Sequence, residues 1–252
     1  MRLLRAYTKP GRDAPMCEAD HTWLVAGHGI VGDANAAHNS PRQVLIASAP
    51  VYHRLGLDPG ALRENFLVDG EIERFASGQV LRIGRSALVR LTIPCEPCAK
   101  LNRVRAGLAR DVAGNRGFLA RVLMDGEVRV GDAVVATERA LPPIPLRPRE
   151  RVYDLVSRIP FGRVLGFKAL VKTLGLTRTY VRVIPRFLVS APGGLPVHRV
   201  VTTDGALIPQ HVHGQAGLLR DEGVYLTRGG RVGEGFLWDS TEYFGAEALA
   251  IA

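Results

Sequence analysis

The sequence reads RTYVRVIPRFLVSAPGGLPVHRVV from Arg178 to Val201. Its first part contains Arg178, Arg182 and Arg186, and residues four apart lie on one face of a helix. The spacing therefore predicts a cationic stripe on a short helix, followed by a turn rich in proline and glycine. Pro185 lies inside this helix, where it removes an amide donor, so the helix is expected to kink or to start late. The alternative interpretation of the three arginines is a solvated face of an ordinary helix.

Positive charge is concentrated around this stretch. Residues 151–200 contain nine lysines and arginines against one acidic residue, Asp154, which is +8 of the chain's formal +9. A dense local field of one sign attracts a polyanion and speeds encounter with it. The composition therefore predicts nucleic acid, duplex DNA first, as the partner of this half of the chain.

Four motifs in this half resemble the DNA-binding domain of the alkylguanine-DNA alkyltransferases. They are Ile159–Val164 (IPFGRV), Pro196–Val201 (PVHRVV), Asp204–Gly205 and Leu218–Val224 (LLRDEGV). In that family the second motif contains a cysteine that accepts the alkyl group from a flipped base, and here the position is Val197. A branched alkane has no lone pair with which to attack. The resemblance therefore implies binding of DNA, including alkylated DNA, without dealkylation, as in the alkyltransferase-like proteins, most of which have tryptophan at this position.

The same resemblance implies roles for individual residues. Phe167 aligns with the family's helix-entry tyrosine, and Arg182 aligns with the arginine that fills the vacated base stack. His198 and Glu222 align with the residues that activate the family's cysteine. With no proton to remove at Val197, we expect them to hold loop geometry through hydrogen bonds. The predicted DNA-binding residues are Phe167, Arg178, Arg182, Arg186, Val197, His198 and Arg199.

The order of elements in this half predicts a winged helix-turn-helix α+β domain over residues 151–252. Helices are expected near Val152–Arg158 and Phe167–Thr173, before the arginine helix, and strands near Arg199–Thr203 and Gly205–Ile208. Upstream, Glu138–Glu150 contains four prolines in thirteen residues. Because proline lacks an amide donor and favours extended chain, this segment is predicted to be a semi-rigid linker.

Residues 1–137 predict a mainly-β barrel. Short runs rich in Val, Ile and Leu are separated by glycines and Asp-Gly pairs, and these runs are expected to be strands. The clearest are Gln43–Ile46, Val80–Ile83, Ala87–Ile93 and Asp132–Val135. One helix is expected over Ser48–Leu57, with Ser48 as its cap and Asp58-Pro59-Gly60 as its stop.

Five motifs in this region, in order, resemble the MOSC domain, which is named for the C-terminal part of molybdenum cofactor sulfurases. They are Gly29–Asp33, Arg42–Ile46, Arg63–Phe66, Pro94–Leu101 and Gly126–Asp132. The resemblance implies a β-barrel that handles molybdenum cofactor or activated sulfur received from a sulfur donor. The resemblance also implies binding of pyridoxal phosphate. Asp33, Arg42, Asn65 and Lys100 are the implied cofactor-binding residues.

The chemistry expected of this region depends on its cysteines. Cys98 aligns with the family's cysteine, and a thiolate is soft enough to ligate molybdenum or to carry a persulfide sulfur. Lys100 and Arg103 favour its thiolate through proximity of charge. Cys98 is therefore the predicted catalytic residue and metal ligand. Cys95 precedes it in a Cys-x-x-Cys spacing, which leaves zinc binding, redox chemistry or two inert buried thiols as alternatives.

Composition limits the remaining possibilities. The chain has 252 residues, of which 46% are hydrophobic and 23% charged, which is an ordinary globular balance. We found no apolar run of membrane-spanning length and no signal-peptide pattern, and three cysteines argue against a disulfide framework, so a reducing cytoplasm is expected. Two other hypotheses stay open: a MOSC-type enzyme whose basic half is only a scaffold, and a sensor of damaged DNA with an inactive barrel.

Overall fold

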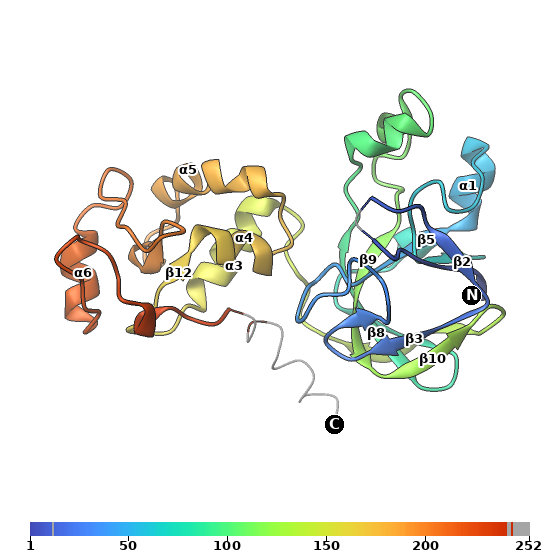
Figure 1. Ribbon diagram of the computed structural model, residues 1–252, viewed down its shortest axis with the longest axis horizontal. Coiled ribbons are helices and arrows are strands. Elements are labelled where there is room, and N and C mark those ends of the chain that lie inside the picture. The colour runs from blue at the N-terminus through green and yellow to red at the C-terminus, as the bar shows by residue number, and fades with distance from the viewer. Residues whose placement is uncertain (12, 241–242, 244–252) are drawn as a thin grey trace. The chain divides into compact units, whose positions relative to one another are not determined.

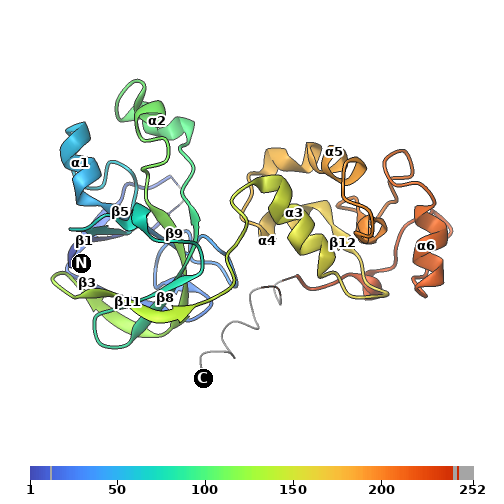
Figure 2. The same cartoon turned by 180° about the vertical axis from the view of Figure 1, so that it is seen from behind.

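The computed structural model describes residues 1–11, 13–240 and 243 (Figures 1 and 2). The chain forms two compact units. Among the described residues, those from Met1 to Ile144 belong to unit 1 and those from Pro145 to Tyr243 belong to unit 2. Unit 1 is a curled, mainly-β structure and unit 2 is α+β, so the predicted fold class is confirmed. No helix among the described residues is long and apolar enough to cross a membrane.

Unit 1 is built on an eight-stranded sheet in the order β11-β7-β8-β9-β5-β6-β1-β2. Its strands are β1 (Leu3–Thr8), β2 (Cys17–Ala19), β5 (Val44–Ser48), β6 (Phe66–Val68), β7 (Gln79–Ile83), β8 (Ala87–Pro94), β9 (Phe118–Met124) and β11 (Val134–Ala140). A second sheet has the order β10 (Gly126–Arg129), β3 (His21–Val25) and β4 (Gly29–Ile30). The large sheet curls until the start of β1 meets the start of β11, where the Val134 amide donates to the Met1 carbonyl at 2.8 Å.

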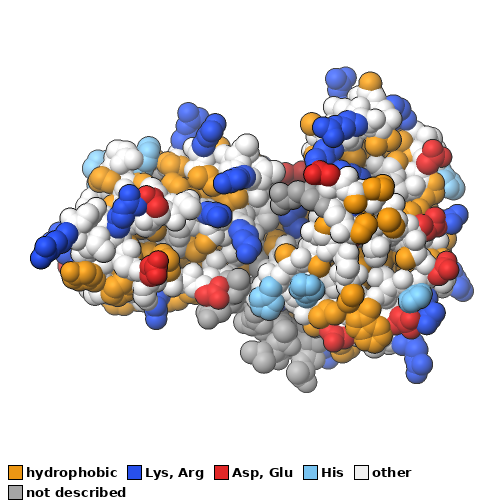
Figure 3. Space-filling view, viewed as in Figure 1, with side chains coloured by type: hydrophobic (Ala, Val, Ile, Leu, Met, Phe, Trp, Pro, Cys, Tyr) orange, Lys and Arg blue, Asp and Glu red, His pale blue; other side chains and the backbone are white. Residues whose placement is uncertain are grey.

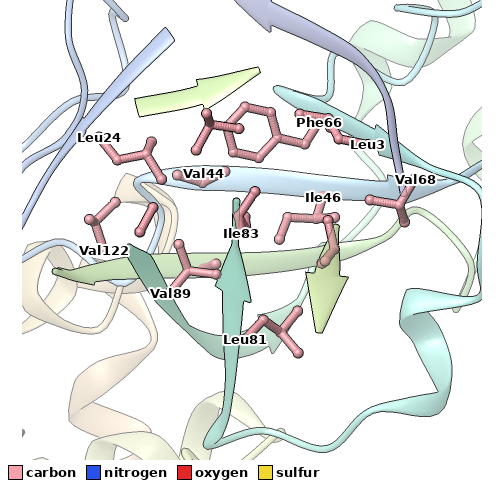
Figure 4. Close-up of a cluster of buried hydrophobic side chains, with 14 of the residues drawn as sticks. Leu3, Leu24, Val44, Ile46, Phe66, Val68, Leu81, Ile83, Val89 and Val122 are labelled. Carbon is pink, nitrogen blue, oxygen red and sulfur yellow. The ribbon is translucent and has the colours of Figure 1, made fainter. Parts of the chain in front are cut away.

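The concave face of this sheet holds the core of unit 1 (Figure 4). Alternate residues of each strand point inward, as the two-residue period of a pleated strand requires. Val44 and Ile46 of β5, Leu81 and Ile83 of β7, and Val89 of β8 are each at most 1% exposed. The four strands expected from the sequence are confirmed, with bounds that differ by at most five residues.

Short helices connect strands of the barrel. They are α1 (Ala49–Leu55), η1 (Ile72–Arg74), η2 (Ala99–Arg103) and α2 (Leu108–Asp111). Helix α1 is shorter than predicted, because it ends at Gly56 in the left-handed conformation before the Asp58-Pro59-Gly60 sequence. Ser48 is its N-cap residue but makes no side-chain capping bond. Its hydroxyl accepts from the Ile72 amide and donates to Glu73 instead.

The proline-rich segment 138–150 is only partly a linker. Strand β11 continues to Ala140, and the Leu141 amide then donates to the Gly78 carbonyl at 2.8 Å. The close approach depends on Gly78, since a Cβ there would overlap the Leu141 carbonyl. Ile144 is 5% exposed, and its amide donates to the Ser77 hydroxyl at 2.8 Å. At the other end, α3 already begins at Pro148, where a proline at the first helical position costs nothing.

Unit 2 has four α-helices among its described residues. They are α3 (Pro148–Ser157), α4 (Phe167–Thr173), α5 (Ile184–Val189) and α6 (Gln215–Asp221), joined by the 3-10 turns η3 (Arg178–Arg182), η4 (Val197–Arg199) and η5 (Glu234–Phe236). The larger apolar cluster of the unit is centred on Val152, Leu155, Leu170 and Ile184, each fully buried, whereas α6 packs through Leu219 into a second cluster. The helix predicted over Phe167–Thr173 is confirmed, and α3 starts four residues before its predicted beginning.

The arginine helix is interrupted before Pro185, as the sequence predicted: η3 ends at Arg182, and α5 starts at Ile184 with Pro185 in its first turn, where proline is tolerated. The two strands expected near Arg199–Thr203 and Gly205–Ile208 need correction. Strand β13 (Val200–Val201) pairs in parallel with β12 (Leu165–Gly166), and Ala206 bridges to Arg231 rather than belonging to a strand over Gly205–Ile208.

Candidate functional site

Five cations on α4, η3 and α5 are exposed, and their side chains form no ion pair or hydrogen bond to the protein within the described part of the chain. They are Lys168 and Lys172 on α4, Arg178 and Arg182 on η3, and Arg186 on α5. Figure 3 shows Lys and Arg side chains outnumbering acidic ones on the visible face of this unit. We call these five residues the open cations. Although η3 and α5 are separate elements, the three arginines of the predicted stripe all reach solvent.

Other arginines of the same unit are bonded to the protein. Arg158 pairs with Asp154 at 3.0 Å, and Arg163 donates to the Gly235 carbonyl at 2.6 Å. Arg220 donates to the Ala216 carbonyl at 3.1 Å. Unit 2 therefore contains two classes of cation, one tied to protein acceptors and one available to a polyanion.

Glu222 organises the turn that contains Val197. Its carboxylate accepts hydrogen bonds from Nε and Nη2 of Arg199, with Nη2 2.7 Å from Oε1, and His198 Nε2 lies 2.8 Å from Oε1. It also accepts from the Gly162 amide at 3.1 Å. Burial raises the pKa of this carboxyl, but bonds from Arg199, His198 and Gly162 outweigh burial and bring the pKa to about 2. This carboxylate stays ionised at neutral pH and bonded to its neighbours.

The predicted base-handling residues lie in different surroundings. Val197 is half-buried and packs against the apolar cluster of unit 2. Phe167 is 6% exposed and belongs to that cluster, so its ring is part of the core rather than of the surface. Arg199 is occupied by Glu222 and by the Ile159 carbonyl at 2.7 Å. Phe161, which is 70% exposed, stacks over Arg199 with 5.7 Å between the guanidinium carbon and the ring centre.

In unit 1, Cys98 is half-buried at the start of η2 and packs against an apolar cluster that includes Leu62 and Leu101. Cys95 is 5% exposed, and burial raises the pKa of its thiol, while the charges of Arg116 and Arg42 act in the opposite direction. Lys100 is half-exposed and lies 3.7 Å from Asp13. Cys98 is thus the more accessible of the two thiols in the Cys-x-x-Cys segment.

Asp33 and Asn65 have their polar atoms engaged within the fold. The Asp33 carboxylate accepts from the Asn65 side chain at 2.9 Å and from the Lys9 amide at 2.8 Å. The Asn65 side-chain oxygen accepts from the Leu45 amide at 2.9 Å. Both side chains are at most 6% exposed. They hold the loops before β5 and β6 together. We expect them to affect a bound ligand only by positioning neighbouring residues.

Cations gather near the Cys98 segment. Burial lowers the pKa of Lys9, and the neighbouring charges of Arg63 and Lys100 lower it further. Arg63 has a positive φ of 62°, which is rare for a residue with a side chain. Non-glycine residues held in this conformation cluster at ligand sites. Together with half-buried Arg42, these side chains provide a setting suited to an anion.

Family comparisons match the two units separately. Residues 33–135 match the MOSC domain, and residues 147–224 match the 6-O-methylguanine DNA methyltransferase DNA-binding domain. The chain is a fusion of these two domains. Among curated protein sequences, none matches it. The MOSC match starts after β1–β4. Strand β1 nevertheless pairs with β6 in the same sheet as the matched strands, and Lys9 directly follows β1.

Three solved structures are similar to parts of this chain. YiiM from Geobacillus stearothermophilus is 15% identical, with 74% of this chain and 98% of that chain covered and a TM-score of 0.48. YuaD from Bacillus subtilis is 18% identical, with 53% and 93% covered and a TM-score of 0.46. S. pombe Atl1, in complex with damaged DNA containing O6-carboxymethylguanine, is 25% identical, with 36% and 93% covered and a TM-score of 0.31.

Several candidate residues escaped the sequence analysis. In the alkyltransferase-type domain these are Lys168 and Lys172, whose spacing of four on one helix was a usable signal. In the MOSC domain they are Lys9, Arg63 and Arg116. Arg63 lies in a motif already singled out, but Arg116 gave no signal, since its partners are backbone carbonyls brought close only by the fold.

Proposed function

We propose that this chain binds duplex DNA through the open cations of its alkyltransferase-type domain, without dealkylating it. The observation behind this proposal is that Lys168, Lys172, Arg178, Arg182 and Arg186 are exposed and unneutralised within the described chain. Phosphate contacts supply most of the affinity of a protein for DNA, and they require cations free of protein partners. Arg182 is the last residue of η3, and Arg186 lies in the first turn of α5, directly after Pro185.

Chemistry at Val197 supports binding without alkyl transfer. Transfer to a protein needs a nucleophile with a lone pair and a base that removes its proton. His198 and Glu222 lie 2.8 Å apart beside Val197, but a valine side chain offers neither lone pair nor acidic proton. Arg199, His198 and Glu222 therefore act as a brace for the turn rather than as a proton relay.

A salt titration with matched duplexes tests this function. One duplex contains a single O6-methylguanine and the other contains guanine, and dissociation constants are measured across a range of salt concentrations. Five phosphate contacts predict that log K falls with log salt at a slope of about −4 to −5. Tighter binding of the modified duplex would support a base pocket beside Val197. No binding of either duplex at low salt would remove the DNA-binding proposal and leave the scaffold hypothesis.

For the MOSC domain we propose that Cys98 is the ligand or carrier for molybdenum or activated sulfur. Its thiol is half-buried and lies in the segment next to Lys100, whose charge also reaches Lys9. Both roles use the sulfur atom of a cysteine that a ligand can reach. The bound species is expected to be anionic, which suits the surrounding Lys9, Arg42, Arg63 and Lys100.

The residues present fit molybdenum cofactor better than a bare metal ion. Within the described chain, no three His, Cys, Asp or Glu side chains come together to hold a metal ion. The cofactor brings its own sulfur ligands and a phosphate, so it needs one soft protein ligand and nearby cations. Cys98 would be that ligand, and Arg63 and Lys100 would face the anionic part. When bound, the molybdenum centre supplies two-electron atom-transfer chemistry.

Metal and sulfur analysis of the purified protein separates the possibilities. The Cys98→Ser variant should lose bound molybdenum, or lose a persulfide formed on incubation with inorganic polysulfide. The Cys17→Ser variant is the matched control, because Cys17 is an exposed thiol on the edge strand β2. Equal molybdenum and persulfide content in both variants would remove Cys98 from the chemistry and favour the sensor with an inactive barrel.

A further inference from the structure

We infer that Arg116 is a positioning residue for Cys98: its guanidinium ties the segment containing Cys98 to the segment containing Arg63. The inference rests on the proposed role of Cys98. It starts from the backbone of residues 95–98, which forms neither helix nor strand between the end of β8 and the start of η2. Such a segment needs restraints from elsewhere if a side chain on it is to keep a defined position.

The first arm of this clamp holds the Cys98 segment. The Cys95 amide donates to the Gly117 carbonyl at 2.9 Å, which fixes the start of the segment. One residue later, the Glu96 carbonyl accepts from Arg116 Nη1 at 2.6 Å. Hydrogen bonds to a charged donor are shorter and stronger than those between neutral groups. Residues 116 and 117 thus hold two consecutive residues of the segment.

The second arm holds the opposite segment. Arg116 Nη2 donates to the Leu62 carbonyl at 3.4 Å. Leu62 is fully buried in the apolar cluster against which Cys98 packs, and Arg63 follows it in the left-handed conformation. A residue keeps that conformation only when its surroundings enforce it. One side chain therefore restrains both the cysteine and the strained arginine of the proposed anion site.

The position of Arg116 is itself built into the fold. Gly117 has a φ of 100°, and a Cβ there would overlap the Ile46 carbonyl, so only glycine allows this entry into β9. Arg116 is 8% exposed, and its Nε has no acceptor within the described part of the chain. Retaining a buried guanidinium whose donors are only partly satisfied is unfavourable for stability, which points to a positioning role.

Hydrogen exchange of the full chain tests the clamp. In Arg116→Gln we expect residues 60–66 and 95–101 to exchange about 10-fold faster, the ratio for a lost hydrogen bond of ordinary strength, while β7 and β10 keep their protection. Cys95, buried in the native protein, should become open to iodoacetamide. Arg116→Lys keeps the charge but reaches one carbonyl at most, so only one of the two segments should regain protection.

The matched control is Arg121→Gln, which removes another buried arginine from the same unit, one bonded to Asn39 at 2.7 Å. It should leave Cys95 protected. If Arg116→Gln exposes neither segment beyond this control, the clamp is refuted, whatever Cys98 does. If the clamp holds but Cys98 binds neither molybdenum nor sulfur, the proposed function fails by itself. If both hold, the loading of Cys98 should drop by about 10-fold in Arg116→Gln, as for other groups that orient a ligand.

Discussion

In the MOSC domain the candidate nucleophile Cys98 is present, and the segment around it is irregular and held by side chains such as Arg116. In the alkyltransferase-type domain Arg199, His198 and Glu222 are bonded together beside Val197, the position that we propose corresponds to the family's acceptor cysteine. The comparison separates two properties that usually occur together, a supporting framework and a reactive atom. A framework preserved without its reactive atom has a structural or binding role, and this can be measured.

The largest expected effect concerns that framework. The Glu222 side chain is 8% exposed, and its pKa is lowered from 4.5 to about 2. A lowered carboxyl pKa stabilises the native state above the unfolded pKa, and this stabilisation is lost as pH falls through the native pKa. The difference corresponds to about 3 kcal/mol of unfolding free energy for unit 2, lost between roughly pH 5 and pH 2.

Chemical denaturation of Glu222→Ala at neutral pH is expected to show a loss of about 3 kcal/mol, because Arg199 is left half-buried without its partner. Asp221→Ala, an exposed acid on the adjacent residue, is the control and should stay near the native value. If Glu222→Ala unfolds at the same denaturant concentration as the native protein, the triad of His198, Arg199 and Glu222 does not brace the turn.

The next effect concerns the open cations. Replacing Arg178, Arg182 and Arg186 by alanine should lower the slope of log K against log salt by about 3, and weaken DNA binding by on the order of 100-fold at physiological salt. The comparison variant replaces Arg158, Arg163 and Arg220, which removes the same charge from residues bonded to protein acceptors. Equal losses in both triple variants would mean that net charge, rather than unpaired cations, drives binding.

How much of this was visible in the sequence differs between the units. Four strands of the barrel followed from short runs rich in Val, Ile and Leu between glycines, and the break before α5 followed from Pro185, since both depend on local sequence. The pairing of Ala206 with Arg231 was not predictable, because strand partners far apart in sequence are chosen by tertiary packing. Arg116 was missed for the same reason. Its partners are backbone carbonyls, which every residue has, so residue types alone cannot identify them.

A smaller effect tests the two cations that the motif comparison overlooked. Lys168 and Lys172 are exposed on α4 four residues apart, so both face the same side of the helix. Their double replacement by alanine should reduce the salt slope by about 2 and weaken duplex binding by about 30-fold. An unchanged slope, measured by the same titration, would confine the DNA surface to η3 and α5.

The smallest change in stability, and the most direct test of the comparison, is Val197→Cys. Valine and cysteine are similar in volume and the site is half-buried, so unfolding free energy should change by about 1 kcal/mol or less. The new thiol would lie beside His198, which Glu222 holds at 2.8 Å. On incubation with duplex containing O6-methylguanine, mass spectrometry should detect a methyl group on residue 197, while the native protein should show none. The double variant Val197→Cys with His198→Ala should lose most of this transfer, because the base that activates the thiol is gone. If Val197→Cys binds the modified duplex but stays unmethylated, the framework is not arranged for transfer, and the missing thiol is not what separates this domain from an active alkyltransferase.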